Sequence, residues 1–381
     1  MTAQTPLSLT DRRRALTGLL AAPLLMTAAG AVAAPTPLVP SPDLDTRSLD
    51  DIHKAAMAEG GKLIVYAGGD VPNAYAGVER AFMTRFPGMS IRMFADLSKY
   101  HDARIDLQLA RGRLEADVAV LQTLHDFDRW KAQGQLLLYR PADWDAIHSE
   151  YKDPDGAYAG IGIIAFSNSY NTAMLTEATA PRDAVDYLDP SLKGRVVLTY
   201  PHDDDAVLYQ FDRIVHAHGW DYMDKLMAQD VLWIRGTVPA RLAVNEGRRA
   251  ATFTASGTFA NIPNAPSRFI LPRNDVFQSW AQTAAILKEA RNKEAAKLFI
   301  SWMAARDTTV GRTGQWSVRR DVPAAGGMKP LGEYNTSPLR FKDFMKDRER
   351  IEILKTQFEH VIGPAAGPNP TGMKGVYLVQ T

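Results

Sequence analysis

The sequence predicts an α/β fold of two lobes joined by a hinge, with a ligand cleft between the lobes. Short apolar runs alternate with amphipathic segments between about residues 62 and 133, as in a mostly parallel sheet covered by helices. A second alternating series runs from about residue 195 to 254, and a long C-terminal part follows it. The length of 381 residues is sufficient for two such units.

The first series begins with an apolar run that predicts a buried strand over 62–67, ending at Gly68-Gly69-Asp70. Pro87-Gly88 ends the helix that follows this strand. Segments with helical spacing then alternate with apolar runs typical of strands. The predicted elements are a helix over 74–86, a strand over 91–94, a helix over 100–111, a strand over 116–121 and a short helix over 126–133.

A strand-rich stretch, 158–166, leads into the second series. This series comprises strands over 195–199, 231–234 and 251–254 and helices over 205–228 and 238–246. Residues 268–271 predict a strand that runs back. Amphipathic patterns predict a long helix over 282–305 and a last helix over 340–360.

The second series is therefore expected to be inserted into the first. We assign lobe 1 to residues 49–165, lobe 2 to 166–268, and the return to lobe 1 with the C-terminal helices to 269–381. Open α/β sheets bind ligands beyond the carboxyl ends of their strands. Two separately packed sheets whose strand ends face each other would form a cleft that closes by a hinge.

The N-terminus has the three parts of an export signal. Arg12-Arg13-Arg14 precedes an apolar run over 15–31, and Ala31-Val32-Ala33 is a small-residue cleavage site. We predict a signal peptide over 1–33 and a flexible, proline-rich leader over 34–48. Residues 10–16 resemble a twin-arginine motif, and the general secretory route fits equally well. A cleaved signal predicts a periplasmic protein without membrane insertion.

Composition excludes several classes of function. The chain has no cysteine, which rules out disulfides, thiolate metal sites and lipid attachment to cysteine. The net charge is +1 and no basic face is apparent, so no nucleic-acid partner is expected. Sequence motifs of serine hydrolases, phosphate-loop enzymes and zinc proteases do not occur. We therefore predict a protein that is not an enzyme and has no cofactor.

Six segments, in order along the chain, resemble type II periplasmic solute-binding proteins of ABC transporters, extracellular solute-binding protein family 1. The resemblance is strongest to the iron(III)-type branch. It implies two lobes around a hinge, and delivery of a small-molecule or metal-complex ligand to an inner-membrane ABC permease. The six segments are 63–67, 81–88, 117–121, 167–172, 187–196 and 315–322.

One difference from that branch concerns the ligand. Iron(III)-binding members carry adjacent tyrosines after the strand that corresponds to 251–254, and phenolate oxygens suit a hard cation. Here residues 256–262 contain no tyrosine. The ligand therefore stays open among a metal, an organic cation, a phosphonate and an organic acid.

Candidate ligand-binding residues in lobe 1 follow the predicted strands. Small residues after a strand let backbone donors approach a ligand, and a helix N-terminus can bind an anion. A tight turn or simple helix capping would explain the same residues. These candidates are Gly69, Asp70, Ser98, Tyr100, Gln122 and Thr123.

In lobe 2, the most unusual segment is His202-Asp203-Asp204-Asp205, which opens a helix. One aspartate is sufficient for a cap, so the run favours a cationic or metal-containing ligand; a solvated acidic cap explains it equally well. Arg235 could bind an oxyanion, or pair with this acidic loop. Trp316 could stack on a ligand, or belong to the core. The remaining candidates are Thr237, Ser256 and Gly257.

The primary hypothesis is a monomeric binding protein that closes around one solute. Two alternatives fit the same residues: a metal-dependent periplasmic hydrolase that uses His202 and the neighbouring aspartates, and a binding protein that presents its ligand to a chemosensory receptor. An enzyme would turn over a substrate, whereas a binder would only be stabilised by it.

Overall fold

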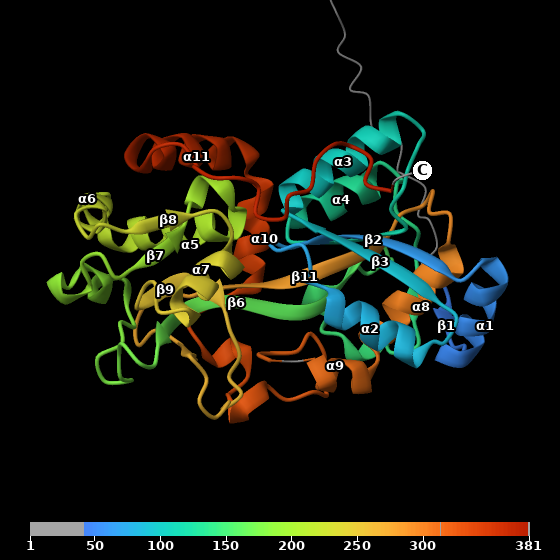
Figure 1. Cartoon of the computed structure of the whole chain (residues 1–381). Helices are drawn as coiled ribbons and strands as arrows, with labels where there is room; N and C mark the ends of the chain where they lie inside the picture. The colour runs from blue at the N-terminus through green and yellow to red at the C-terminus, as the bar shows by residue number, and fades with distance from the viewer. Residues whose placement is uncertain (1–41, 313, 380–381) are drawn as a thin grey trace, which may run out of the picture. The chain divides into compact units, whose positions relative to one another are not determined.

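The computed structural model describes residues 42–312 and 314–379. The predicted signal peptide over 1–33 and most of the predicted leader lie outside these residues. Two groups of helices and strands are joined by two long strands, β6 (Ala159–Asn171) and β11 (Gln278–Ile286), which run through both (Figure 1). Within the described residues, no helix is both long and apolar enough to span a bilayer.

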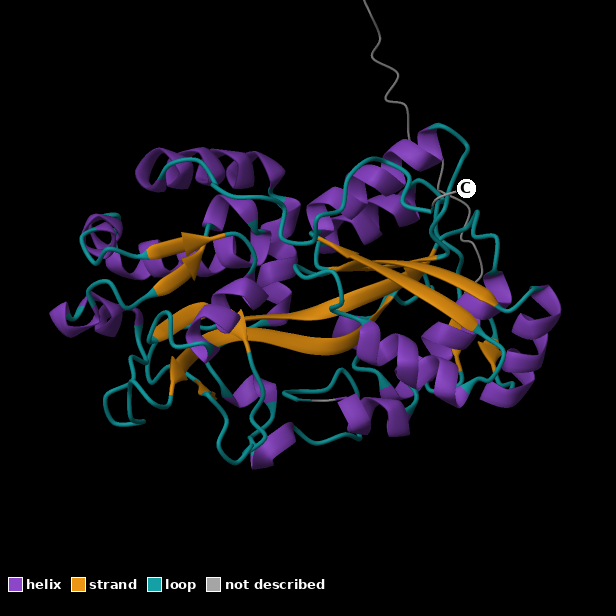
Figure 2. Ribbon diagram, viewed as in Figure 1, coloured by secondary structure: helices purple, strands orange, loops and turns teal. Residues whose placement is uncertain are grey.

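The first half of the fold surrounds a parallel sheet. Strand β2 (Lys62–Gly68) pairs in parallel with both β3 (Ser90–Asp96) and β4 (Val118–Leu121). Helices lie on both sides of these strands (Figure 2). They are α1 (Leu49–Glu59), α2 (Ala76–Arg85), α3 (Ser98–Ala110), α4 (Leu124–Ala132) and α8 (Lys293–Ala304), and the short α9 (Arg306–Arg312) follows α8.

The second half contains two short parallel strands, β7 (Val197–Thr199) and β8 (Leu232–Ile234), and the antiparallel strands β9 (Ala251–Ser256) and β10 (Ser267–Ile270) beside β6. The predicted helix over 205–228 is two helices because Gly219 adopts a positive φ of 74°. The helices of this half are α5 (Asp205–His218), α6 (Asp221–Met227), α7 (Thr237–Asn245), α10 (Pro338–Lys346) and α11 (Arg348–Ile362).

The expectation of two separate, mostly parallel sheets is wrong. One seven-stranded mixed sheet runs through both halves in the order β10-β6-β11-β4-β2-β3, with β9 also paired to β6. The cause is the length of β6, whose first part pairs with β11 and whose later part pairs with β9 and β10. Two minor strands, β1 (Leu44–Asp45) and β5 (Arg140–Pro141), pair separately.

The helix expected over 282–305 is also wrong in its first part, which belongs to strand β11. All nine residues of β11 are buried, so its apolar pattern lacks the alternation of a half-exposed strand. Such a run cannot be distinguished from a buried helix by periodicity. The helical part begins only at Lys293 in α8.

Residues 363–379, which we call the C-terminal strap, return from α11 to the first half (Figure 1). The Thr371 hydroxyl donates to the buried carboxylate of Asp96 at 2.7 Å. The backbone amide of Leu378 donates to Glu115 at 2.7 Å. The strap therefore connects the two halves a third time, in addition to β6 and β11.

Candidate ligand-binding site

Asp70, which follows β2 in the first half, caps helix α7 of the second half. Its Oδ2 accepts hydrogen bonds from the Thr237 backbone amide, the Thr237 hydroxyl at 2.9 Å and the Val238 amide at 3.0 Å. The N-cap position of α7 is Gly236, with a φ of 85° and no side chain to serve as a cap. A Cβ at Gly236 would lie 3.1 Å from the Cβ of Asp70, so glycine allows this close approach.

A second contact between the halves centres on Asp203. Its carboxylate pairs with Lys99 of α3 at 2.7 Å and with Arg235 at 2.8 Å. Arg235 also donates to the Tyr100 hydroxyl at 2.9 Å. Burial alone would raise the pKa of Asp203, but hydrogen bonds and charge from Arg235 and Lys99 outweigh it, so the pKa is lowered.

The other two aspartates of the acidic loop also have partners in the protein. Asp204 caps α5 by accepting from the amides of Ala206 and Val207, and Gln122 donates to it at 3.3 Å. Burial raises the pKa of Asp204 to about 6, although the hydrogen bonds from the helix amides act to lower it. Asp205 lies 3.2 Å from the ammonium group of Lys355. The loop therefore does not need an external cation to compensate its charge.

Two further predicted residues make ordinary structural contacts, and the side chains of two others have no hydrogen-bond partner among the described residues. The Gly69 amide donates to the backbone carbonyl of Asp96, and the buried Ser98 hydroxyl accepts from the Gln122 backbone amide at 3.1 Å. Thr123 is buried at the N-cap position of α4, but its hydroxyl makes no capping hydrogen bond. Both ring nitrogens of His202 are buried without a hydrogen-bond partner, and burial lowers the pKa of this histidine.

A cavity of about 320 Å³ lies where the two halves meet the long strands, and we call it the hinge cavity. Tyr75 and Val120 line it from the first half, and Ser256 and Gly257 from the end of β9 in the second. Strands β6 and β11 contribute residues 161–164 and Gln282, and the segment around α9 contributes Thr309, Arg312, Gly314, Gln315 and Trp316.

Most polar side chains of the hinge cavity are engaged with the protein. The Gln315 amide donates to the Gly257 carbonyl at 2.9 Å, and its oxygen accepts from the Ala165 amide. Gln282 accepts from the indole of Trp280, and Tyr75 donates to the Gly68 carbonyl at 2.6 Å. Trp316 is 3% exposed and stacks on Phe277, so it forms part of the cavity wall and the core together.

Arg312 is the exception. Among the residues that line the hinge cavity it is the one ionisable side chain besides Tyr75, and it remains accessible to solvent. Desolvation by the surrounding protein lowers its pKa, and Tyr75 opposes this shift. The contact described for its guanidinium is the Met303 sulfur at 2.9 Å, a weak acceptor.

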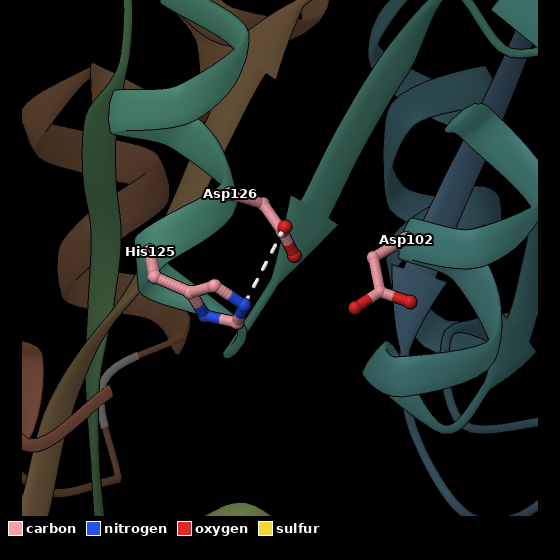
Figure 3. Close-up of side chains that lie close together, drawn as sticks. All are labelled: Asp102, His125 and Asp126. Atoms are coloured by element: carbon pink, nitrogen blue, oxygen red, sulfur yellow. Dashed lines mark ion pairs between the residues drawn. The ribbon is translucent and has the colours of Figure 1, made fainter. Parts of the chain in front are cut away.

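A separate group of ionisable side chains consists of Asp102 on α3 and His125 and Asp126 on α4, which face the same space (Figure 3). One potential ligand atom from each lies within 4.8 Å of the others. Burial, followed by the charge of Asp126, raises the pKa of Asp102 to about 8. Arg129 pairs with Asp126 at 2.6 Å, so a second cation is not required there.

Ten of the fifteen sequence-predicted residues thus fall into two groups. The contacts between the halves use Asp70, Tyr100, Gln122, Asp203, Asp204, Arg235 and Thr237, and the hinge cavity uses Ser256, Gly257 and Trp316. Sequence reasoning missed Tyr75, Gly162, Gln282, Arg312 and Gln315 in the cavity. Gln315 immediately precedes Trp316, which together with Ser256 and Gly257 is a predicted residue of this cavity.

Comparisons with known proteins agree with this architecture. A family model described as bacterial extracellular solute-binding protein matches residues 89–309, which is more than half of the chain. No curated protein matches the chain.

Solved structures share the fold at low sequence identity. Iron-bound HitA from Pseudomonas aeruginosa is 19% identical, with a TM-score of 0.60 over 78% of this chain and 99% of its own. AfuA from Actinobacillus pleuropneumoniae, a periplasmic binding protein with fructose-6-phosphate bound, is 20% identical, with a TM-score of 0.63 over 80% and 100%. An ABC-transporter substrate-binding protein from Agrobacterium tumefaciens is 14% identical, with a TM-score of 0.68 over 79% and 94%.

These findings confirm the predicted two-lobed α/β fold and the resemblance to type II periplasmic binding proteins, including the iron(III)-type branch. They also favour the carrier hypothesis over the hydrolase and the chemosensory protein. The chain belongs to the bacterial extracellular solute-binding protein family.

Proposed function

We propose that this chain binds one small organic solute in the hinge cavity and delivers it to an inner-membrane permease. The observation that carries the proposal is the lining of the cavity, which comes from both halves and from the two strands that join them. A solute held by both halves stabilises their contact, which is how a hinge closes around a ligand.

The relatives bind different ligands, and the cavity favours one kind. HitA is described as iron-bound and AfuA as bound to fructose-6-phosphate. The described residues that line the hinge cavity include no aspartate, glutamate or histidine and only one phenol, that of Tyr75. A bare metal ion requires several such ligands. Apolar walls from Val120, Ile161 and Ile163 suit an organic molecule.

The same proposal covers the lobe boundaries, the oligomeric state and the location of the protein. We assign lobe 1 to residues 49–165, lobe 2 to 166–268 and the return to 269–381, with α10 and α11 packed on the core of lobe 2. The protein works as a monomer in the periplasm after removal of its export signal, and it performs no catalysis. Incubation with a bound solute should therefore return that solute unchanged.

Gly162 provides a direct test of the site. It lines the hinge cavity, and a Cβ placed on it would meet no atom within 4 Å. Gly162→Leu should therefore fill the cavity without a clash in the core, and Gly162→Ala should leave most of the space free.

We expect Gly162→Leu to abolish solute binding in titration calorimetry, while Gly162→Ala retains it and both variants keep the wild-type circular dichroism spectrum. Full solute affinity in a folded Gly162→Leu protein would show that the ligand binds elsewhere.

A further inference from the structure

We infer that the solute carries an oxyanion, a phosphate or a carboxylate, and that Arg312 binds it in the hinge cavity. This inference rests on the proposed function, because it concerns the same cavity and names the class of its ligand. A ligand with an oxyanion is negatively charged, whereas the acidic loop led to the expectation of a positively charged ligand.

The first argument is the lack of a counter-ion. Three arginines that are more buried than Arg312 pair with carboxylates: Arg104 with Asp96 at 2.7 Å, Arg235 with Asp203 at 2.8 Å, and Arg319 with Asp321 at 2.7 Å. For Arg312, the described part of the chain supplies the Met303 sulfur and the nearby Tyr75 but no carboxylate. A guanidinium has five N–H donors in a planar fork, so most of them remain available to a ligand.

The second argument is that nearby negative charge is already compensated. Asp70 lies close enough to influence Tyr75 electrostatically, but its Oδ2 accepts three hydrogen bonds at the N-terminus of α7. Asp203 is paired with Lys99 and Arg235. An anion in the hinge cavity therefore meets one cation directly and no unpaired carboxylate among the described lining residues.

The third argument is the match between one charge and an otherwise neutral cavity. A volume of about 320 Å³ is at the lower end of the range for organic ligands. Most polar side chains besides Arg312 are engaged with the protein, whereas Val120, Ile161 and Trp316 offer apolar surface. A guanidinium binds phosphate and carboxylate in the same two-pronged manner, so both chemistries fit.

Arg312 also ends helix α9, where a positive charge would favour the helix dipole without any ligand. The test must therefore separate a ligand contact from a structural role. The variants are Arg312→Ala, Arg312→Lys and Gly162→Leu. The control is Arg80→Ala, which changes an exposed arginine on α2, outside the residues that line the cavity.

Matched probes decide the class of ligand. Glucose 6-phosphate is compared with glucose, citrate represents carboxylates, and spermidine and ferric nitrilotriacetate represent the cationic and metal-complex alternatives. Thermal-shift measurements at millimolar concentration identify binders, and calorimetry gives their affinities.

We expect glucose 6-phosphate, citrate or both to bind wild-type protein and the Arg80→Ala control equally. Arg312→Ala should weaken this binding by about 10- to 100-fold, the range for a charge-assisted contact, and Arg312→Lys should weaken it less. Gly162→Leu should abolish it.

Three results would overturn the inference. They are no binding by either anionic probe, equal binding of glucose and glucose 6-phosphate, and anion binding unchanged in Arg312→Ala. If a neutral or cationic probe binds and Gly162→Leu abolishes that binding, the proposed function stands and the oxyanion inference is wrong. If an anion binds regardless of Gly162→Leu, the hinge cavity is not the site.

Discussion

The contact between Asp70 and helix α7 should control how readily the two halves separate. Asp70→Ala removes the acceptor of three hydrogen bonds that pass from the second half to the first. Gly236 cannot replace the lost cap because it has no side chain. Asp70→Asn keeps one neutral acceptor and should have an intermediate effect.

The magnitude follows from the cost of removing a helix cap, about 0.5–2 kcal/mol. If this energy stabilises only the closed arrangement, the ratio of closed to open molecules should fall by about 2- to 30-fold. Solute affinity should fall with it, because only the closed arrangement contacts the ligand from both halves.

Single-molecule energy transfer can measure this ratio directly. The chain contains no cysteine, so cysteines introduced at Lys54 on α1 and Ile353 on α11 would be the two labelling sites. Both positions are exposed, Lys54 at 78% of its side chain and Ile353 at 59%. Asp70→Ala should increase the low-transfer population in the absence of solute.

Asp221→Ala is the matched control, because Asp221 is an exposed acid in the first turn of α6 within the second half. It should leave the energy-transfer distribution unchanged. An unchanged distribution in Asp70→Ala as well would refute the reasoning, since the contact would then not contribute to closure.

Three other perturbations have defined outcomes. Arg235→Ala leaves the buried Asp203 with Lys99 alone and should cost about 1.5–3 kcal/mol in urea unfolding at pH 7. Because folding lowers the pKa of Asp203, this loss should be smaller at pH 3 than at pH 7, and an equal loss at both pH values would contradict the reasoning. Asp102 has its pKa raised to about 8, so the folded protein holds this proton more tightly and loses stability as the pH rises from about 4 to 8. Asp102→Asn should therefore raise the melting temperature at pH 8.5 and change it much less at pH 4, and a shift of equal size at both would argue against a buried charge. Thr371→Val removes a hydroxyl bonded to Asp96 and should destabilise the protein by about 1 kcal/mol in denaturant unfolding, whereas Thr356→Val, at an exposed hydroxyl on α11, should have little effect.

Much of the fold could be predicted from the sequence because most strands are apolar runs bounded by glycine or proline. The predicted strand over 62–67 corresponds to β2, and those over 91–94 and 251–254 correspond to β3 and β9. Strand β11 was missed because every residue in it is buried. That error, together with a strand β6 that extends beyond the predicted 158–166, is why two sheets were expected instead of one continuous sheet.

The same error concealed part of the site. Gln282 lies in β11, so assigning it to a helix removed it from any cleft. The acidic loop was predicted to bind a ligand because His202 and three aspartates are adjacent in sequence. The partner of Asp205, Lys355, lies 150 positions further along the chain, and sequence spacing cannot reveal such a contact. The same limit applies to Arg312, whose significance depends on which carboxylates are absent around it in space.

The C-terminal strap sets a geometric limit on how far the molecule can open. Helix α11 ends at Ile362, and Asn369 and Thr371 are the first strap residues bonded to Asp96. The intervening residues 363–368 can span roughly 20 Å in total when fully extended, at about 3.5 Å per residue. Prolines at 364 and 368 restrict the backbone of this short segment. Any wider opening would first have to break the hydrogen bond between Thr371 and the buried Asp96, so the length of these six residues limits how far the halves can separate.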